Sequence, residues 1–144
     1  MADIYTIWAN KAGDISDLDW VTNMKGFFDH LVSEGRMETY RITRCKMGFR
    51  SIADMPEFMI LMEFRDMAQM DSAFKRVAPL EGELEDKHRS FNQFVDCSTI
   101  QHALFRDWPD QLDLLERSVL FTSFKNFCFS VLSRSCGHNS PVAG

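Results

Sequence analysis

The amino-acid sequence predicts an α+β fold in which helices pack on a four-stranded antiparallel sheet. Strand-like and helix-like segments follow one another in the order β-α-β-β-α-β. The first and third strand-like segments are apolar on both faces, whereas the second and fourth are of mixed polarity. The chain of 144 residues is long enough for one domain with an appendage. We therefore expect one α+β domain in residues 1–110 and an extension in residues 111–144.

The composition argues against several classes of protein. Hydrophobic residues make up 45% of the chain, which is enough apolar surface to exclude disorder throughout. No apolar run approaches the roughly eighteen residues of a transmembrane helix, so we expect no membrane partner. The net charge of -5 disfavours nucleic-acid binding, which uses a basic surface. The N-terminus lacks the basic and apolar regions of a signal peptide, and we expect a cytoplasmic protein.

The first strand-like segment is followed by an amphipathic helix. Residues 3–10 are rich in β-branched and aromatic types, and strand alternation places Thr6 and Trp8 on one face. Ser16 then supplies an N-cap and Gly35 a left-handed residue at the C-terminal end. Between these two positions lies one apolar stripe with helical spacing, made of Trp20, Val21, Met24, Phe27, Phe28, Leu31 and Val32.

Two more strands and a second helical region follow. Residues 37–47 and 57–65 indicate the second and third strands, of which the third is the more apolar. Asp66 is placed to cap a second helix. Pro79 interrupts that helix, and a further helical stretch continues after it.

The last strand completes a known arrangement of elements. Residues 93–100 indicate a fourth strand, and we expect residues 102–110 to leave the sheet because Pro109 stops regular structure. Right-handed crossovers then put both helical layers on one face of the sheet. In the ferredoxin-like arrangement the strand order is 4-1-3-2. The two central strands of that order are the two apolar strands predicted here, so local composition and topology agree.

The opposite face of the sheet has no predicted cover. Its two central strands are apolar there as well, which makes a larger patch than a monomer normally exposes. The simplest cover is a second copy of the same sheet in a twofold dimer. We therefore expect a homodimer formed through the sheet face, which gives a dimeric α/β barrel.

The chain resembles the dimeric α/β-barrel proteins of the ferredoxin-like superfold over roughly residues 3–110. The likeness rests on the element order and on the segments YRITRCKMGFR (40–50), DSAFKRVA (71–78) and LFRDWPD (104–110). That group includes antibiotic-biosynthesis monooxygenase-like, EthD-like and stress-responsive barrel proteins. The chain is most similar to small uncharacterised bacterial members, with a distant likeness to the antibiotic-biosynthesis monooxygenase-like proteins. The resemblance implies a dimer with a pocket between the sheet and the helices of each protomer. The characterised oxygenases of the group work without metal or flavin, so we expect no cofactor.

The extension in residues 111–144 differs from the rest of the chain. It holds four of the thirteen phenylalanines, at no single helical spacing. We expect an appended helix of about twenty residues followed by a disordered end. Two interpretations remain open: the extension packs on the outside of the barrel, or it is a poorly evolved addition.

Common catalytic and metal-binding motifs are absent from the sequence. There is no phosphate-binding loop, dinucleotide-binding fingerprint, H-E-x-x-H or G-x-S-x-G motif. The four cysteines and four histidines are scattered, so we expect no metal site. Three groups of side chains remain as candidates for a site.

The first candidate is His88, on the apolar stripe of the second helical region between Leu84 and Phe91. A histidine held there is suited to general-base catalysis, or to binding the polar end of a ligand. If any residue is catalytic, we expect it to be His88. The alternative is a core histidine whose hydrogen bonds are satisfied within the protein.

The second candidate is the basic run Arg41, Arg44 and Lys46 on the second strand. Arg44 is suited to a ligand carboxylate, because the guanidinium group makes two parallel hydrogen bonds. The alternative is a charged edge strand that resists further pairing. Arg65 and Arg106 allow the same two interpretations with less support.

The third candidate is a collection of methionines and aromatic residues. All nine methionines lie in the first 70 residues, and methionine is frequent at surfaces that adapt to apolar ligands. The alternative is that these side chains fill a core. Together with Arg44 and His88, the predicted ligand-binding residues are Trp8, Met24, Phe28, Tyr40, Phe58, Met62 and Phe74.

Three functions are consistent with these patterns. The first is a homodimer that binds an apolar small molecule, such as a fatty-acid-like or polyketide-like compound. The second is a cofactor-independent monooxygenase or isomerase of the same fold, which would need a polar group with a shifted pKa in the pocket. The third is a protein-interaction module without a pocket, whose Phe-rich extension binds a partner.

Overall fold

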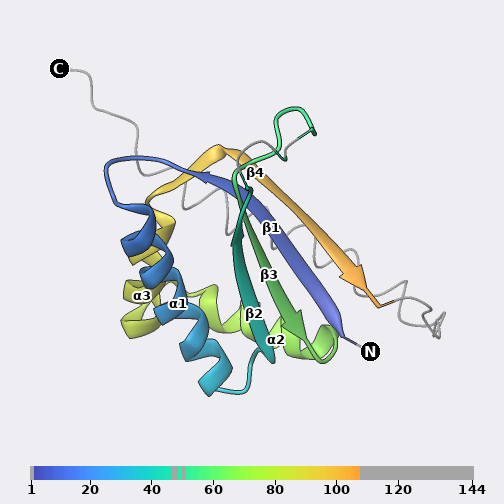
Figure 1. Cartoon of the computed structure of the whole chain (residues 1–144). Helices are drawn as coiled ribbons and strands as arrows, with labels where there is room; N and C mark the ends of the chain where they lie inside the picture. The colour runs from blue at the N-terminus through green and yellow to red at the C-terminus, as the bar shows by residue number, and fades with distance from the viewer. Residues whose placement is uncertain (1, 47–48, 50, 108–144) are drawn as a thin grey trace. The chain divides into compact units, whose positions relative to one another are not determined.

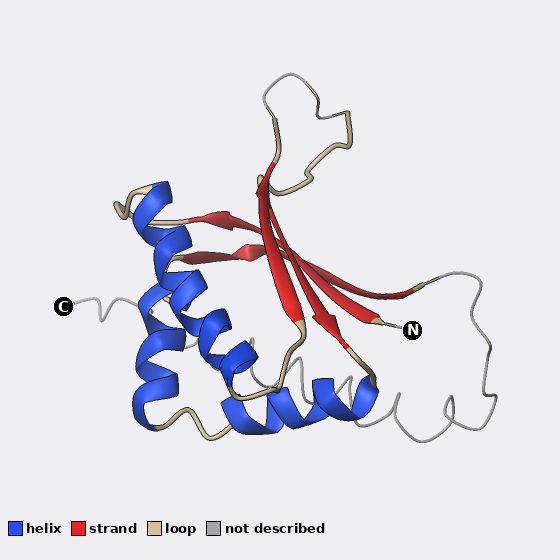
Figure 2. Cartoon of the chain, turned by 60° about the horizontal axis from the view of Figure 1, so that its bottom comes forward, coloured by secondary structure: helices blue, strands red, loops and turns tan. Residues whose placement is uncertain are grey.

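Three helices cover one face of a four-stranded antiparallel sheet (Figure 1). This computed structural model describes residues 2–46, 49 and 51–107. The elements are β1 (Asp3–Lys11), α1 (Asp17–Ser33), β2 (Thr39–Arg44), β3 (Phe58–Phe64), α2 (Met67–Val77), α3 (Gly82–Asn92) and β4 (Val95–Arg106). The strand order is β2-β3-β1-β4, which confirms the predicted order 4-1-3-2 and the ferredoxin-like arrangement. Figure 2 shows α1, α2 and α3 on the same side of the sheet.

Helix α1 begins and ends at the predicted residues. The Ser16 side chain accepts a hydrogen bond of 3.0 Å from the backbone N–H of Asp19, which caps the helix. Gly35 follows the helix with φ at 68°, a conformation that costs glycine little. The buried residues of α1 are Trp20, Met24, Phe27, Phe28 and Leu31, all on the predicted stripe. Trp20 Nε1 donates to the carbonyl oxygen of Phe91 at 2.9 Å, which fastens α1 to α3.

The second helical region is divided in two, as Pro79 predicts. Asp66 caps α2 by accepting a hydrogen bond from the backbone N–H of Gln69 at 2.8 Å. The chain then turns at Leu80 and at Gly82, the first residue of α3, and both have positive φ. Helix α3 buries Leu84 and Phe91. None of the described helices is long and apolar enough to cross a membrane.

The last strand is longer than predicted. β4 continues to Arg106 and pairs with β1 as far as Asp3, so the prediction that residues 102–110 leave the sheet is wrong for residues 102–106. β4 is an edge strand with many exposed side chains, so it does not need alternating apolar residues. The alternation used to predict strands is therefore weak in residues 102–106. β2 is shorter than the predicted residues 37–47. The predicted extension in residues 111–144 lies outside the described residues.

Candidate functional site

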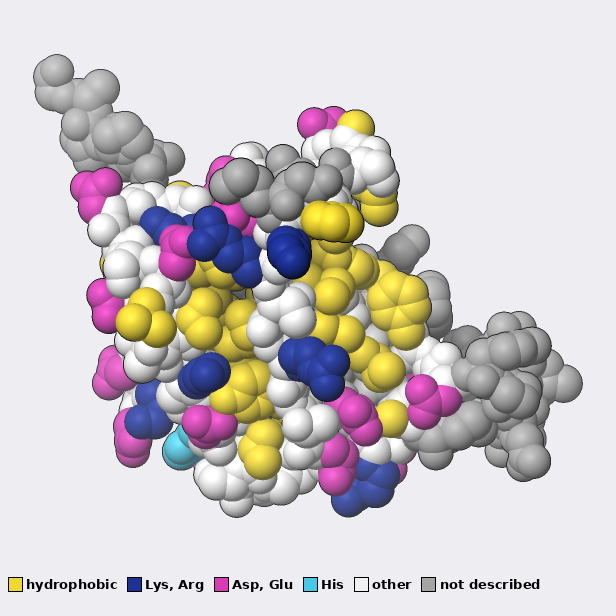
Figure 3. Space-filling view, in the orientation of Figure 1, with side chains coloured by type: hydrophobic (Ala, Val, Ile, Leu, Met, Phe, Trp, Pro, Cys, Tyr) yellow, Lys and Arg dark blue, Asp and Glu magenta, His cyan; other side chains and the backbone are white. Residues whose placement is uncertain are grey.

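The side of the sheet opposite the helices is here called the open face. Register and strand alternation assign twelve described side chains to it. They form three rows across the sheet, in strand order β2, β3, β1, β4: Thr39, Glu63, Ile4 and Phe105; Arg41, Leu61, Thr6 and Ala103; Thr43, Met59, Trp8 and Gln101. Figure 3 shows hydrophobic side chains gathered over the sheet, with basic and acidic side chains beside them.

The centre of the open face is apolar, and its β2 edge is polar. Ile4, Trp8, Met59 and Leu61 are half-buried on the two central strands. Phe105, on the β4 edge, is 50% exposed. A large aromatic side chain on an apolar sheet surface is suited to packing against another molecule.

Thr6 lies in the middle row and is 1% exposed, although it belongs to the open face. The Trp8 and Phe105 side chains come from the rows on either side of it. Their ring centroids are 6.4 Å apart and their planes are inclined by 77°. The register therefore places the meeting point of these rings over the row that holds Thr6. Thr6 Oγ1 is buried and makes no hydrogen bond.

The open face also carries two opposite charges. Arg41 lies directly across from Leu61, and Glu63 lies across from Thr39 on the same two strands. Arg41 and Glu63 are therefore diagonal neighbours, yet neither belongs to any of the ion pairs found among the described residues. Opposite charges on the same patch allow two copies of that patch to pair across a twofold axis.

The other side of the sheet holds most of the predicted ligand-binding residues. Met24, Phe28, Phe58 and Met62 are buried there, each no more than 5% exposed. Trp20 packs edge-on against Phe58 with ring centroids 5.0 Å apart. These side chains fill the space between sheet and helices as a core, which is the alternative interpretation considered for the methionine and aromatic set. Trp8 is separated from them because it lies on the open face.

Phe74 and Tyr40 lie at two different edges of this core. The Phe74 ring meets Tyr5 edge-on, with ring centroids 5.4 Å apart. The Tyr40 hydroxyl donates to Asp29 Oδ1 at 2.6 Å, and its ring is 5.1 Å from that of Phe28. Partial burial, then the hydrogen bond to Asp29 and its negative charge, raises the pKa of Tyr40 well above its usual range. The hydroxyl therefore stays protonated and acts as a donor.

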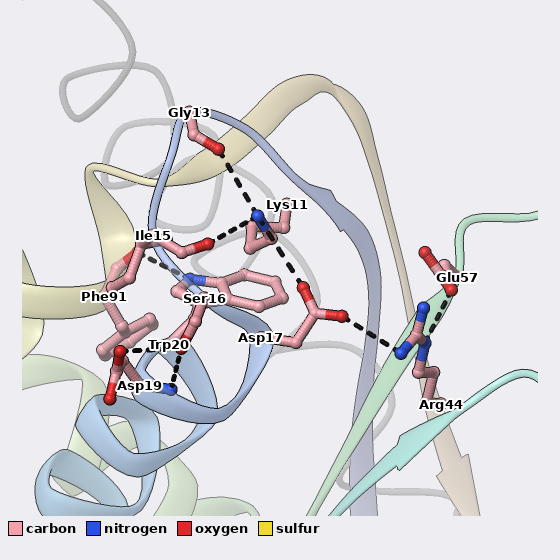
Figure 4. Close-up of polar contacts among 10 residues, drawn as sticks. All are labelled: Lys11, Gly13, Ile15, Ser16, Asp17, Asp19, Trp20, Arg44, Glu57 and Phe91. Carbon is pink, nitrogen blue, oxygen red and sulfur yellow. Dashed lines mark hydrogen bonds and ion pairs between the residues drawn. The ribbon is translucent and has the colours of Figure 1, made fainter.

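Arg44 binds carboxylates of its own chain (Figure 4). Its Nε atom is 2.6 Å from Glu57 Oε1, and its Nη1 atom is 3.0 Å from Asp17 Oδ2. Lys11 Nζ lies 3.7 Å from the other carboxylate oxygen of Asp17. The hydrogen bond to Glu57 is the main cause that raises the pKa of Arg44. This network joins the start of α1 to β2 and to the residue before β3, so Arg44 already has the partners that a ligand carboxylate would replace.

His88 is enclosed between α1 and α3. Its ring lies 5.2 Å from the Phe27 ring and 5.5 Å from the Phe91 ring, measured between centroids. Its Nδ1 atom is 3.2 Å from Glu85 Oε2, and both side chains are nearly buried. Burial lowers the pKa of His88, while the Glu85 carboxylate acts in the opposite direction. A neutral imidazole that donates to Glu85 accounts for this geometry.

Two further polar pairs join β1 to β4, and one of them contains Arg106, which was a less supported candidate for a ligand carboxylate. The Tyr5 hydroxyl lies 3.2 Å from Nδ1 of the exposed His102, across the β1–β4 pairing. Arg106 makes two hydrogen bonds to the buried Asp3, at 2.6 and 3.1 Å. Both pairs follow from the register between β1 and β4. A fourth strand that ends at residue 100, as predicted, does not contain His102 or Arg106.

Along α2, the helix side has a shallow groove of about 360 Å³. Its lining residues are Arg36, Ala68, Asp71, Ser72, Lys75 and Arg76. Its basic groups are already paired: Lys75 with Asp71 at 2.6 Å, and both arginines with Glu34. Among the described residues, no three His, Cys, Asp or Glu side chains gather where they would hold a metal ion. The open face is therefore the candidate site.

One comparison with a solved structure supports the fold, and a second match is weaker. The chain is similar to a dimeric ferredoxin-like protein of unknown function from Jannaschia sp. CCS1, with a TM-score of 0.55 and 12% identity. That match covers 74% of this chain and 100% of the other. A dimeric protein of unknown function and ferredoxin-like fold from Bacteroides fragilis NCTC 9343 matches with a TM-score of 0.46 and 6% identity. It covers 74% of this chain and 96% of the other.

Comparisons with sequences give a family but no activity. No protein with a curated description matches the chain, so the predicted likeness to antibiotic-biosynthesis monooxygenase-like proteins stays a prediction. A family model matches residues 2–119, which include every strand and helix described above. The chain therefore belongs to the family of unknown function DUF6614.

Proposed function

We propose that this protein is a homodimeric small-molecule-binding protein in which the open faces of two sheets pack together as an α/β barrel. The observation that carries the proposal is the apolar centre of the open face, with the half-exposed Phe105 ring at its edge. Pairing with a second copy would remove this surface from water at about 25 cal/mol per Å² of apolar area. It would also leave the helices on the outside of the dimer.

Two further observations support a second copy as the occupant of the open face. Arg41 and Glu63 carry opposite charges and belong to no ion pair among the described residues, so a twofold axis that passes between them would bring each toward the other in the partner. The similar protein from Jannaschia sp. CCS1 is described as dimeric, and all of it is covered by the match. At 12% identity that likeness supports the fold, while the surface itself supports the dimer.

The ligand belongs between the two sheets in this proposal. The predicted pocket between the sheet and its helices is occupied by buried side chains such as Trp20, Phe58 and Phe64. The open face offers an apolar surface with few polar groups, which is the usual lining of a small-molecule site. A fatty-acid-like or polyketide-like molecule has the apolar surface to match it. The geometry gives His88 no comparable support as a catalytic base, because two aromatic rings and Glu85 enclose it.

Sedimentation velocity of the full chain at micromolar concentration tests the dimer. The wild type is expected to sediment as a dimer, and Leu61→Asp as a monomer, because two charges would be buried at the centre of the interface. Leu18→Asp is the matched control, since Leu18 is 76% exposed on α1, away from the open face. A monomeric wild type, or a dimeric Leu61→Asp variant, contradicts the proposed interface.

Native mass spectrometry of the purified chain tests the ligand. A small molecule that co-purifies with the wild-type dimer and is lost from Leu61→Asp is the expected result. Leu18→Asp should retain it. Retention by the monomeric Leu61→Asp variant would place the ligand elsewhere in the protomer.

A further inference from the structure

The centre of the open face holds a polar group that the fold leaves without a partner. Thr6 Oγ1 is buried and makes no hydrogen bond, and it is the one such side-chain atom found among the described residues. Burying an unpaired hydroxyl is costly, and folded proteins satisfy nearly all buried polar groups. Thr43, two strands away on the same face, shows the usual outcome, because its hydroxyl donates to the Met59 carbonyl oxygen at 3.1 Å.

The side chains around Thr6 differ in size in a regular way. Thr6 and its cross-strand neighbour Ala103 are both small. The rows on either side of them carry the large rings of Trp8 and Phe105, which are in edge-to-face contact. Rotation of these two side chains about χ1 would uncover the small residues and the hydroxyl. The Trp8 and Phe105 rings would then lie on opposite sides of the uncovered space, because one comes from β1 and the other from β4, in the two outer rows.

We propose that Thr6 is the hydrogen-bonding anchor for the ligand, and that this ligand is an apolar molecule carrying an uncharged hydroxyl or carbonyl oxygen. The inference rests on the proposed function and specifies its ligand class. A threonine hydroxyl donates one hydrogen bond and accepts others, so it pairs with either kind of oxygen. Trp8 and Phe105 provide aromatic surface for the apolar part of the molecule.

The charges on the open face explain why the ligand oxygen is uncharged. Arg41 is in the same row as Thr6 but on β2, with Leu61 of β3 between them. Two strand spacings put their backbones about 10 Å apart. A carboxylate at Thr6 would be desolvated among apolar side chains, with Leu61 between it and Arg41, whereas a neutral oxygen needs only the hydrogen bond. Among the two ligand types considered above, this favours polyketide-like over fatty-acid-like molecules.

Equilibrium dialysis of the full chain against three matched probes tests this inference. The probes are 2-naphthol, naphthalene and 2-naphthoate, which share one ring system and differ in the polar group. A purely apolar site prefers naphthalene, because naphthalene is the most hydrophobic of the three. The wild type is expected to bind 2-naphthol about fivefold more tightly than naphthalene, the ratio for one net hydrogen bond. It should bind 2-naphthoate most weakly.

Three variants identify the group responsible. Thr6→Val keeps the shape of the side chain and removes its hydroxyl, so the preference for 2-naphthol over naphthalene should disappear. Thr6→Ser keeps a hydroxyl and should keep the preference. Thr43→Val removes a hydroxyl that is already hydrogen-bonded within the sheet, and it should bind like the wild type.

The outcomes separate this inference from the proposed dimer. Failure of the wild type to bind 2-naphthol, the absence of a preference, or a preference that persists in Thr6→Val overturns the anchor. Sedimentation of the same samples reports the dimer, which Thr6→Val should leave intact. A dimer without a Thr6-dependent preference refutes the anchor alone. A monomer with that preference refutes the dimer and keeps the anchor.

Discussion

The two faces of the sheet use their polar groups differently. On the helix side, Tyr40 and His88 are each bonded to a carboxylate, and Trp20 to a backbone carbonyl oxygen. On the open face, Thr6 Oγ1 has no hydrogen-bond partner, and neither Arg41 nor Glu63 is in an ion pair within the part of the chain that the structure describes. Folding alone accounts for the first set, since each group is satisfied within the chain. The first set stabilises the fold, whereas the second set is available for the binding proposed above.

The largest difference in unfolding free energy is expected between alanine variants of the two described tryptophans. Trp20 is fully buried and bonded to Phe91, so Trp20→Ala should lower the free energy of unfolding by about 3–5 kcal/mol. Trp8→Ala removes a half-buried ring from the open face and should cost the protomer about 1 kcal/mol. Urea unfolding followed by circular dichroism measures both values, at a protein concentration low enough for monomers. Equal losses would remove the distinction between the faces.

The next largest loss of stability is expected when the ion pair between Asp3 and Arg106, at the end of the sheet, is broken. Asp3→Ala leaves the Arg106 guanidinium without its buried carboxylate, and we expect a loss of about 2 kcal/mol in unfolding free energy. Glu38→Ala is a control that breaks an exposed pair with Arg65, at 3.5 Å, and also removes a hydrogen bond from Gln69. It should cost about 1 kcal/mol or less. A smaller effect from Asp3→Ala than from Glu38→Ala contradicts the importance given to burial.

Thr6→Val is expected to stabilise the protein, unlike the substitutions above. Replacing an unpaired buried hydroxyl with a methyl group of similar size is expected to raise the unfolding free energy by about 1 kcal/mol. Thr43→Val should lower it by up to about 1 kcal/mol, because a hydrogen bond to Met59 is lost. Thermal unfolding by calorimetry distinguishes the two signs. A destabilised Thr6→Val variant would show that the hydroxyl does have a partner in the folded protein.

The smallest expected effect is a pH dependence of the unfolding free energy, which comes from His88 on the helix side of the sheet. Burial lowers the pKa of His88 in the folded chain, so the unfolded chain binds the proton first as the pH falls. Stability from this residue is present above the unfolded value of about 6.5 and declines as the pH drops below it. His88→Gln should flatten the unfolding free energy between pH 7 and pH 5.5, compared with wild type. His30→Gln is the control, because His30 is a half-buried histidine on another helix, α1, whose Nε2 atom lies 3.2 Å from Glu34 Oε1. An unchanged slope in His88→Gln contradicts this account.

Much of the fold was predictable because its strong signals are local. The caps Ser16 and Asp66, the glycine at 35 and the stripe on α1 act within a few residues of one another. The strand order followed from which strands are apolar on both faces. The end of β4 was not predictable in this way, because its pairing with Asp3 joins residues 103 positions apart.

The candidate site was predictable only in part. Alternation along the first strand correctly placed Thr6 and Trp8 on one face. It did not show that Phe105 from β4 meets Trp8, since this contact depends on the register. Arg44 and His88 were singled out for their chemistry, and their partners Glu57, Asp17 and Glu85 become apparent only in three dimensions.

The contacts of Asp3 with Arg106 have a consequence for chain topology. They hold the first residue of β1 beside the last residue of β4, and the Ala2 amide lies 3.4 Å from Asp107 Oδ2. Position 2 and position 107 are thus neighbours at one corner of the sheet. In a chain shortened to residues 2–107, a short peptide linker would join them covalently. We expect new ends opened at the exposed residues Ser51 and Ile52 to give a circularly permuted version of the same fold.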